Sequence, residues 1–355
     1  MKKILFWGCL LLATACTNEL DFDMESAPDA LLLSAQLRAE DTRHAVYASL
    51  GTGGTLAKAP DLEIWCYVND KPVAQAVPGK PETVIPPVKP ERTAYQRTIY
   101  VFDATFEPGD RVRITAEASG WQASGQSVFP RRPKVTAVDT LSILTPKRWR
   151  PEEVTRDLQV SVSLDDPAGE DNWYMLETLL RREVVLHGPT EPDSLMQDIR
   201  YIRPNTGDDP ILSDGVIISN EELFGTISVN SYNYFSDRLF AGETGRMTFK
   251  IGHSDLGASY APSLNYDQMM RFTSADVTTI LEVRVLSIGQ EEYNYMKAIG
   301  IQASGFYFSN FMEPVAIPNN VSGATGFIGT LSGQSRRFVF PDMHLNWGGI
   351  MTESK

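Results

Sequence analysis

Residues 62–77 have the sequence LEIWCYVNDKPVAQAV, and their pattern is the clearest local indication of the fold. Apolar residues occupy every second position of the first half, namely Leu62, Ile64, Cys66 and Val68. Asn69-Asp70 then separates this run from a second extended run that continues to Val77. A two-residue turn between two such runs is typical of a β-hairpin. The segment therefore predicts antiparallel β-structure.

The same pattern continues after the hairpin, beyond a proline-rich loop. Alternating residues at 100–106 lead to Glu107-Pro108-Gly109-Asp110, which has the residue order of a type II turn. A second alternating run at 112–118 is followed by Ser119-Gly120 and another strand at 121–129. Short strands at this spacing predict an immunoglobulin-like β-sandwich over residues 28–132.

The remainder of the chain, 133–355, is predicted to form a second β-rich domain. Its expected strands lie at 135–144, 158–164, 173–185, 247–251 and 280–286, with a loop-rich stretch at 187–215. One helix is expected from about Gly289 to Gln302, because Ser287 and Gln290 have capping-box spacing and because Tyr293, Met296 and Ile299 recur on one face. The tail at 323–340 is expected to form a glycine-rich turn and a final hairpin. The predicted fold class is mainly β, with one C-terminal helix.

Residues 1–15 have the features of a secretory leader. Lys2 and Lys3 precede an apolar run that is shorter than the roughly 20 residues of a membrane-spanning helix. The segment Leu12-Ala13-Thr14-Ala15-Cys16 resembles a bacterial lipobox, although an ordinary signal peptide with an unrelated cysteine is the alternative. We expect lipidation at Cys16, an acidic tether at 16–27 and an outer-membrane location, and whether the protein faces the cell surface stays open.

The net charge limits the possible binding partners, and the cysteine content limits the possible disulfides. Removal of Lys2 and Lys3 with the leader takes the formal net charge from −13 to −15. This charge disfavours nucleic acid, because phosphate binding depends on clustered Lys and Arg. It also disfavours attachment to anionic lipid through a basic patch. With Cys9 in the leader and Cys16 lipidated, Cys66 alone remains, so we expect no disulfide and a fold held by core burial.

The sequence contains no recognisable catalytic or metal-binding motif. Its histidines lack paired spacing and lie far apart, at His44, His187, His253 and His344. Cys66 lies on an alternating strand, which favours a core residue over a nucleophile. A single cysteine is too few for a structural zinc site. Serine-nucleophile and phosphate-binding motifs are absent from the sequence. We therefore expect no cofactor, no metal and no catalytic residue.

Three weaker features each have two interpretations. An acidic group could hold calcium, but a solvated turn is favoured: Asp165, Asp166, Glu170 and Asp171. Two aromatic groups could form a binding surface, but core packing is favoured: Tyr232, Tyr234 and Phe235, and Phe306, Tyr307, Phe308 and Phe311. Asn319, Asn320 and the turn at 323–329 could form a site, but tight turns are the default interpretation of the glycines.

Several segments together resemble a known family. In the first half they are ALLLSAQLRAEDTRHAVYASL (30–50), WCYVNDKPVA (65–74) and FEPGDRV (106–112). In the second half they are DDPAGEDNWYMLE (165–177), FSDRLFAGE (235–243), LEVRVLSIGQEEYNYMK (281–297) and EPVAIPNNVSGATGFIG (313–329). The chain is similar to the domain-of-unknown-function family 4249, lipoproteins of Bacteroidota. The resemblance implies an envelope lipoprotein with an immunoglobulin-like N-terminal half, and it carries over no catalytic residue.

Two classes of function follow from these features, and a third stays open. The preferred one is a non-enzymatic binding or accessory component at the outer membrane, partnering a TonB-dependent transporter. This preference rests on an analogy with other β-sandwich proteins, which often present binding loops. The alternative is a glycosidase-like surface hydrolase that uses dispersed carboxylates such as Asp165, Asp166 and Glu177, which the fold would have to bring together. A purely structural surface protein is the third.

Overall fold

A computed structural model gives the structure of the protein. It describes residues 29–52, 55–80, 82–84, 95–147, 150–190, 192–202, 204–213, 217–220, 225–228, 233–252, 256, 271–304, 316–340 and 343–346. Within these residues, strands make up most of the secondary structure, and the α-helix of more than one turn is α4, near the C-terminal end. The mainly β fold class with a C-terminal helix is confirmed.

Nine strands lie among the described residues before residue 130. They are β1 Ala30–Arg38, β2 Arg43–Thr52, β3 Thr55–Lys58, β4 Glu63–Val68, β5 Lys71–Pro78, β6 Glu82–Val84, β7 Tyr95–Asp103, β8 Arg111–Ala118 and β9 Trp121–Val128.

The remaining elements follow Lys134. They are β10 Lys134–Lys147, β11 Arg150–Asp165, β12 Trp173–His187, β13 Ser194–Ile202, β14 Ile217–Asn220, β15 Gly225–Ser228, β16 Tyr234–Ser236, the 3-10 turn Asp237–Leu239, β17 Thr244–Ile251, β18 Ser274–Ile288, α4 Gln290–Ser304, β19 Val321–Ser322, β20 Ile328–Val339 and β21 Met343–Asn346.

The hairpin predicted at 62–77 is confirmed. β4 and β5 pair antiparallel across Asn69 and Asp70, whose φ angles are 51° and 67°. Two consecutive left-handed residues define the type I′ turn, whose twist matches that of the flanking strands. Asn and Asp tolerate this conformation better than most residues. The alternation is also reproduced, because Ile64 and Cys66 are buried in the core.

The strands before residue 130 pack around one hydrophobic cluster. β1, β2 and β7 pair in sequence on one side, and β5, β4, β8 and β9 pair on the other, with β5 joining the two groups. Buried side chains from both groups meet in this cluster, among them Leu33, Val46, Ile64 and Ile114. This is a two-layered β-structure; its assignment as immunoglobulin-like stays a prediction.

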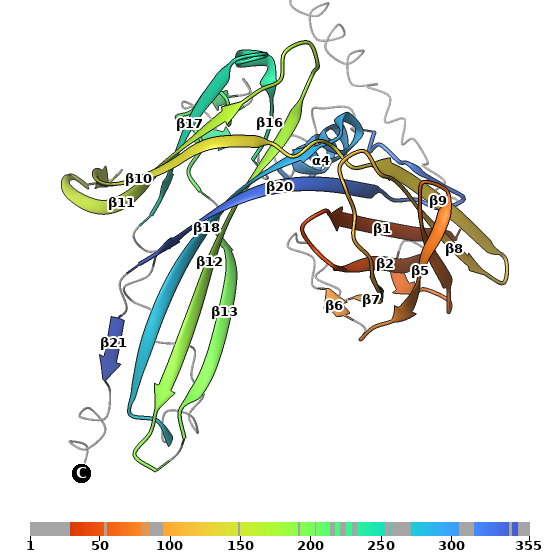
Figure 1. The fold of residues 1–355 in the computed structure, drawn as a ribbon, viewed down its shortest axis with the longest axis horizontal. Helices are drawn as coiled ribbons and strands as arrows, with labels where there is room; N and C mark the ends of the chain where they lie inside the picture. The colour runs from red at the N-terminus through yellow and green to blue at the C-terminus, as the bar shows by residue number, and fades with distance from the viewer. Residues whose placement is uncertain are drawn as a thin grey trace, which may run out of the picture.

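The strands after residue 134 form two further layers. β12 and β18 pair antiparallel along their whole length, and β13 and β16 extend this sheet beyond β12. A separate sheet of order β10-β11-β17 packs against it. Their shared cluster includes Val162, Phe249, Leu180 and Val283. Figure 1 shows β12, β13 and β18 as a long blade that extends from the rest of the molecule.

Strand β20 connects these two parts. Its first residues pair in parallel with β1, where Gln36 lies opposite Gly329, and its later residues pair antiparallel with β18. In Figure 1 it crosses the middle of the molecule between the two groups of strands. Just before it, Val321 of β19 pairs with β9 and enters the first cluster. The predicted boundary at 132/133 stays a prediction, but the C-terminal strands contribute to both parts.

Two local predictions are wrong, and a third is incomplete because it misses a strand. Residues within the loop-rich stretch 187–215 form β13, which pairs with β12 despite the prolines on either side. The predicted capping box fails because Ser287 still belongs to β18, opposite Ser332, and the first helical N–H bond runs from Tyr293 to the carbonyl of Gly289. The final hairpin predicted within 323–340 is instead the single 12-residue strand β20.

Candidate functional site

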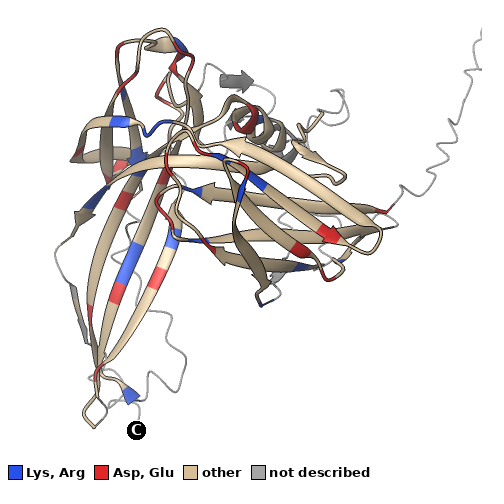
Figure 2. Ribbon diagram, turned by 45° about the vertical axis from the view of Figure 1, so that its right-hand side comes forward, with Lys and Arg blue, Asp and Glu red and all other residues tan. Residues whose placement is uncertain are grey.

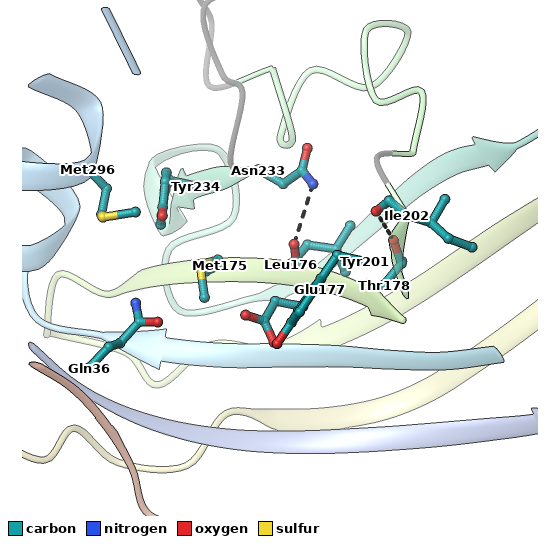
Figure 3. Close-up of a pocket in the computed structure, with 10 residues that line it drawn as sticks. All are labelled: Gln36, Met175, Leu176, Glu177, Thr178, Tyr201, Ile202, Asn233, Tyr234 and Met296. Carbon is teal, nitrogen blue, oxygen red and sulfur yellow. Dashed lines mark hydrogen bonds between the residues drawn. The ribbon is translucent and has the colours of Figure 1, made fainter. Parts of the chain in front are cut away.

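A cavity of about 400 Å³ lies where the two parts of the molecule meet. Its walls come from β1, β12, the end of β13, the residues around β16, and α4 (Figure 3). The lining residues are Gln36, Met175, Leu176, Glu177, Thr178, Tyr201, Ile202, Asn233, Tyr234 and Met296. The lining is mostly apolar with a few converging polar groups, which is the usual composition of a ligand site.

The cavity lies beside a change of partner along β12. β13 ends at Ile202, whose carbonyl oxygen accepts a hydrogen bond from the Thr178 hydroxyl at 2.7 Å. Nearer the start of β12, its neighbour on this side is β16. Between the two neighbours, the Asn233 carbonyl accepts a hydrogen bond from the Leu176 N–H at 3.0 Å, and the Asn233 side-chain amide donates to the Leu176 carbonyl (Figure 3). Asn233 has a φ of 56°, a left-handed conformation that Asn adopts at low cost.

Glu177, at the edge of the cavity, is held by Arg38 from β1. The Arg38 guanidinium donates two hydrogen bonds, at 2.8 and 2.6 Å, to the two carboxylate oxygens of Glu177. Both side chains are largely buried, with 14% and 12% of their surfaces exposed. Burial disfavours the charged form of Arg38, but its hydrogen bonds and attraction to Glu177 hold its pKa above the usual value. A bidentate, largely buried pair fixes the orientation of β1 against β12.

Further charged residues on β18 and β20 extend the Arg38–Glu177 pair into a row of charges. Arg284 of β18 lies 4.0 Å from Glu177 and donates to Glu282 at 2.8 Å. Glu282 also accepts a hydrogen bond from Arg337 of β20 at 3.2 Å. Burial opposes the ionised form of Glu282, yet the two arginines lower its pKa overall. Figure 2 shows acidic and basic residues side by side along these strands. The row therefore joins β1, β12, β18 and β20 electrostatically.

Glu292 of α4 is a buried carboxyl next to the cavity. One oxygen accepts the Gln36 side-chain amide at 3.1 Å, and the carboxyl also accepts a backbone hydrogen bond from Thr330. Its Oε2 has no hydrogen-bond partner within the described part of the chain. Burial raises the pKa of Glu292 to about 7, although the charge of Arg38 acts in the opposite direction. Near neutral pH, protonated and ionised forms of this carboxyl therefore coexist.

The carboxylates considered for hydrolysis are not brought into one cleft. Asp165, at the end of β11, pairs with Lys134 at 2.7 Å and accepts the Thr244 hydroxyl at 2.6 Å. Asp166 accepts the Tyr174 hydroxyl at 2.7 Å. Tyr174 and Glu177 are three residues apart on β12 and so point to opposite faces of the sheet. Asp165 and Asp166 thus support the β11–β17 end of the fold, whereas Glu177 lies at the cavity.

The acidic group suggested as a calcium site is divided between two environments. Glu170 and Asp171 are exposed, as a solvated turn predicts, and Glu170 lies 3.6 Å from Arg131. The turn interpretation is wrong for Asp166, which is buried and also accepts the Gly242 N–H. Burial, together with the nearby Asp166, raises the pKa of Asp237. No group of three or more His, Cys, Asp or Glu among the described residues has an arrangement that could hold a metal.

Two histidines that lie far apart in the sequence meet at the tip of the blade. His187 of β12 contacts Asp193 at 3.0 Å and Asp276 at 2.9 Å, and His344 of β21 contacts the other oxygen of Asp276 at 2.7 Å. The two aspartates raise the pKa of His187, and the two histidines lower that of Asp276. Sequence spacing does not reveal this cluster, because strand pairing creates it: β21 pairs with β18 and places His344 opposite Asp276.

The other singled-out residues have structural roles where they are described. Cys66 is buried in the core, and burial raises the pKa of its thiol to about 12. Tyr234 and Phe235 are buried, which confirms core packing for these two. Cys16, the leader and the tether lie outside the described residues, as do His253, Tyr232, Phe306, Tyr307, Phe308 and Phe311.

The segment around Asn319 and Asn320 fastens the C-terminal part to the first sheet. Asn319 accepts the N–H groups of Val321 and Gly326, at 3.0 and 3.2 Å. Asn320 exchanges hydrogen bonds with Ile328 and donates to the Gln126 carbonyl. Gly326 has a φ of 151° and lies directly against the Leu33 carbonyl, where a side chain would not fit. The tight-turn interpretation is confirmed for Gly323 and Gly326, which have positive φ angles, and is wrong for Gly329, which lies in strand β20.

Sequence reasoning missed most of the cavity. Arg38, Gln36 and Glu292 gave no recognisable motif, because they become neighbours only when β1, α4 and β20 meet. The one available signal was Glu292 itself, a charged residue adjacent to Tyr293 on the apolar side of the predicted helix. No helix within the described residues is long and apolar enough to cross a membrane.

The fold and the site define a mainly β protein whose two parts share one strand and border an open cavity at their junction. The chain belongs to the family Domain of unknown function (DUF4249), which matches residues 17–337. No curated protein matches it.

Similarity to solved structures is remote. A DUF4785 family protein from Legionella pneumophila subsp. pneumophila str. Philadelphia 1 is 10% identical, with a TM-score of 0.19, over 72% of this chain and 51% of that one. The chain thus spans about half of that protein. A B domain of a biofilm associated protein is 6% identical, with a TM-score of 0.14, over 86% of this chain and 85% of that one. These similarities assign no function.

Proposed function

We propose that this protein is a lipid-anchored component of the outer membrane, attached through Cys16, that binds a partner at the junction cavity without transforming it. The expected partner is an outer-membrane transporter of the TonB-dependent kind, for which the protein acts as an accessory subunit. The acidic tether at 16–27 and the formal net charge of −15 after loss of the leader suit a protein held away from an anionic membrane surface.

The observation that carries this proposal is the pairing of Glu177 with Arg38. Glu177 is the acidic residue among the ten that line the cavity. Both of its oxygens accept hydrogen bonds from Arg38, so the orientation of the carboxylate is fixed by this partner. A glycosidase needs two carboxyls in the same cleft, and Glu177 is the one carboxyl among the described residues that line the cavity. The apolar walls and a fixed polar group favour binding.

Affinity purification from native membranes, with partners identified by mass spectrometry, tests the proposal. Wild type is compared with Met296→Trp, which adds bulk to one cavity wall, and with the control Val73→Trp at an exposed position of β5. We expect a stoichiometric membrane partner with wild type and Val73→Trp, and its loss with Met296→Trp. Thermal unfolding establishes that both variants are folded. A protein that elutes alone in every case, or equal capture by Met296→Trp, overturns the proposal.

A further inference from the structure

Strand β13 forms an open edge with an apolar face. It is the terminal strand of the 16-stranded sheet and pairs with β12, with no second partner among the described strands. Leu195, Ile199 and Tyr201 point to the same face and are 64%, 51% and 68% exposed. Apolar edge strands are templates for pairing with another strand, and native proteins usually cover or charge them.

The backbone groups of these same residues face the open edge. On its β13 side, β12 donates the Leu176 N–H to Asn233, while on its β18 side the His187 carbonyl accepts the Thr273 N–H. Backbone groups alternate between the two sides of a strand, so even-numbered residues of β12 direct theirs toward β13. Arg200 lies opposite Leu180 and directs its own groups toward β12. Ile199, one residue earlier, must therefore direct its N–H and C=O away from β12.

The sequence of β13 is complementary to itself in one antiparallel register. Centring on Asp198 would oppose two carboxylates, and centring on Arg200 would oppose two guanidiniums, both unfavourable. Centring on Ile199 places Asp198 opposite Arg200 of a second copy, and two-fold symmetry forms this pair twice. Within one chain the two side chains lie 3.5 Å apart, with 38% of the Arg200 side chain and 55% of the Asp198 side chain exposed.

We propose that β13 pairs antiparallel with β13 of a second copy of this chain, about a two-fold axis at Ile199. The interface is isologous, so it closes after two copies and leaves no open edge to extend. Ile199 packs against Ile199 of the second copy, and Tyr201 lies opposite Gln197 of the second copy. Because Tyr201 also lines the junction cavity, the second copy borders the mouth of that cavity. This inference is independent of the proposed function.

Cysteine cross-linking in membranes of cells that express the full chain tests the register. In Ile199→Cys, the paired Cα atoms would be about 5.5 Å apart, which a disulfide spans. The control is Leu195→Cys, on the same exposed face, whose copies would lie about 26 Å apart in this register. We expect an oxidised dimer on a non-reducing gel with Ile199→Cys alone, since Cys66 is buried. Dimers in both variants, or in neither, overturn the proposal.

A charge exchange tests the interface without cysteines. Asp198→Arg and Arg200→Asp each oppose like charges twice and should raise the dimer dissociation constant about tenfold. The double variant restores opposite charges and should recover the wild-type value. Sedimentation equilibrium of the detergent-solubilised protein measures this. A wild-type monomer, a monomer that captures a different protein at β13, or a dimer insensitive to both single changes overturns the proposal.

Discussion

Gly329 lies so close to Glu292 that a Cβ built on the glycine would come within 2.6 Å of the Glu292 Oε1. Gly329 belongs to β20, opposite Gln36 of β1, and Gln36 donates a hydrogen bond to the same carboxyl. The absent side chain therefore provides the space in which a helix carboxyl is buried between the two parts of the molecule. α4, β1 and β20 are held together at this point.

Replacing Gly329 by alanine should destabilise the protein. The added methyl group must displace either the Glu292 carboxyl or the β20 backbone, and overpacking of this kind costs about 1–3 kcal/mol. Urea unfolding measures the change. Gly289→Ala is the matched control, because a Cβ at Gly289 meets no atom within 4 Å. Equal stability of the two variants would show that the carboxyl moves aside freely.

The raised pKa of Glu292 predicts a specific pH dependence of stability. Burial shifts it from an ordinary value near 4.5 to about 7, so the folded state retains its proton after the unfolded state has lost it. Stability therefore falls as the pH rises from about 4.5 to 7 and stays at the lower level above that range. The group contributes no difference below pH 4.5, where both states are protonated.

Glu292→Gln should remove this loss, because glutamine resembles the protonated acid. We expect the variant to match wild type near pH 4.5 and to exceed it by a few kcal/mol at pH 8, as a shift of this size implies. Denaturant unfolding at several pH values measures the difference. Glu291→Gln, on the exposed side of the same helix, controls for removal of a charge. A constant difference across the pH range contradicts the prediction.

Arg38 and Glu177 should behave as a coupled pair. Loss of one partner leaves a largely buried charge without its counter-ion, which costs about 3–5 kcal/mol in buried pairs. Arg38→Met and Glu177→Met should therefore each destabilise strongly, while the double variant should lose far less than the sum. A double-mutant cycle by urea unfolding measures the coupling. The exposed pair Arg150–Glu153 is the comparison, with about 1 kcal/mol or less expected. Additive losses at Arg38 and Glu177 would sink the prediction.

The sequence predicted the fold well where the decisive contacts are local. Alternation and turn residues located the β4–β5 hairpin, including the two left-handed residues Asn69 and Asp70. They failed for β20, because its partners β1 and β18 lie far away in the sequence, and because its first residues pair with β1 and its later residues with β18. Propensity alone also missed β13, whose flanking prolines suggested a loop.

The candidate site was less accessible from the sequence than the fold. Glu177 was singled out, but for a pairing with Asp165 and Asp166 that β-strand alternation prevents. Its true partner, Arg38, is 139 positions away, and no spacing rule connects them. The same applies to His187 and His344, which meet only because β12 and β21 both pair with β18. Sites assembled by sheet pairing leave no short motif.

The N-terminal segment gives the last prediction. If Cys16 is lipidated, Cys16→Ser should abolish incorporation of radiolabelled palmitate and release the protein from the membrane fraction, because one serine hydroxyl cannot accept the thioether-linked lipid. Cys9→Ser, in the apolar part of the leader, should keep both label and membrane association, as should Cys66→Ala in the buried core. Metabolic labelling followed by membrane fractionation distinguishes the three. A wild type without label would mean that an ordinary leader precedes an unmodified chain. Label retained by Cys16→Ser would mean that the lipid is attached at another residue, and in either case the outer-membrane role would need a different anchor.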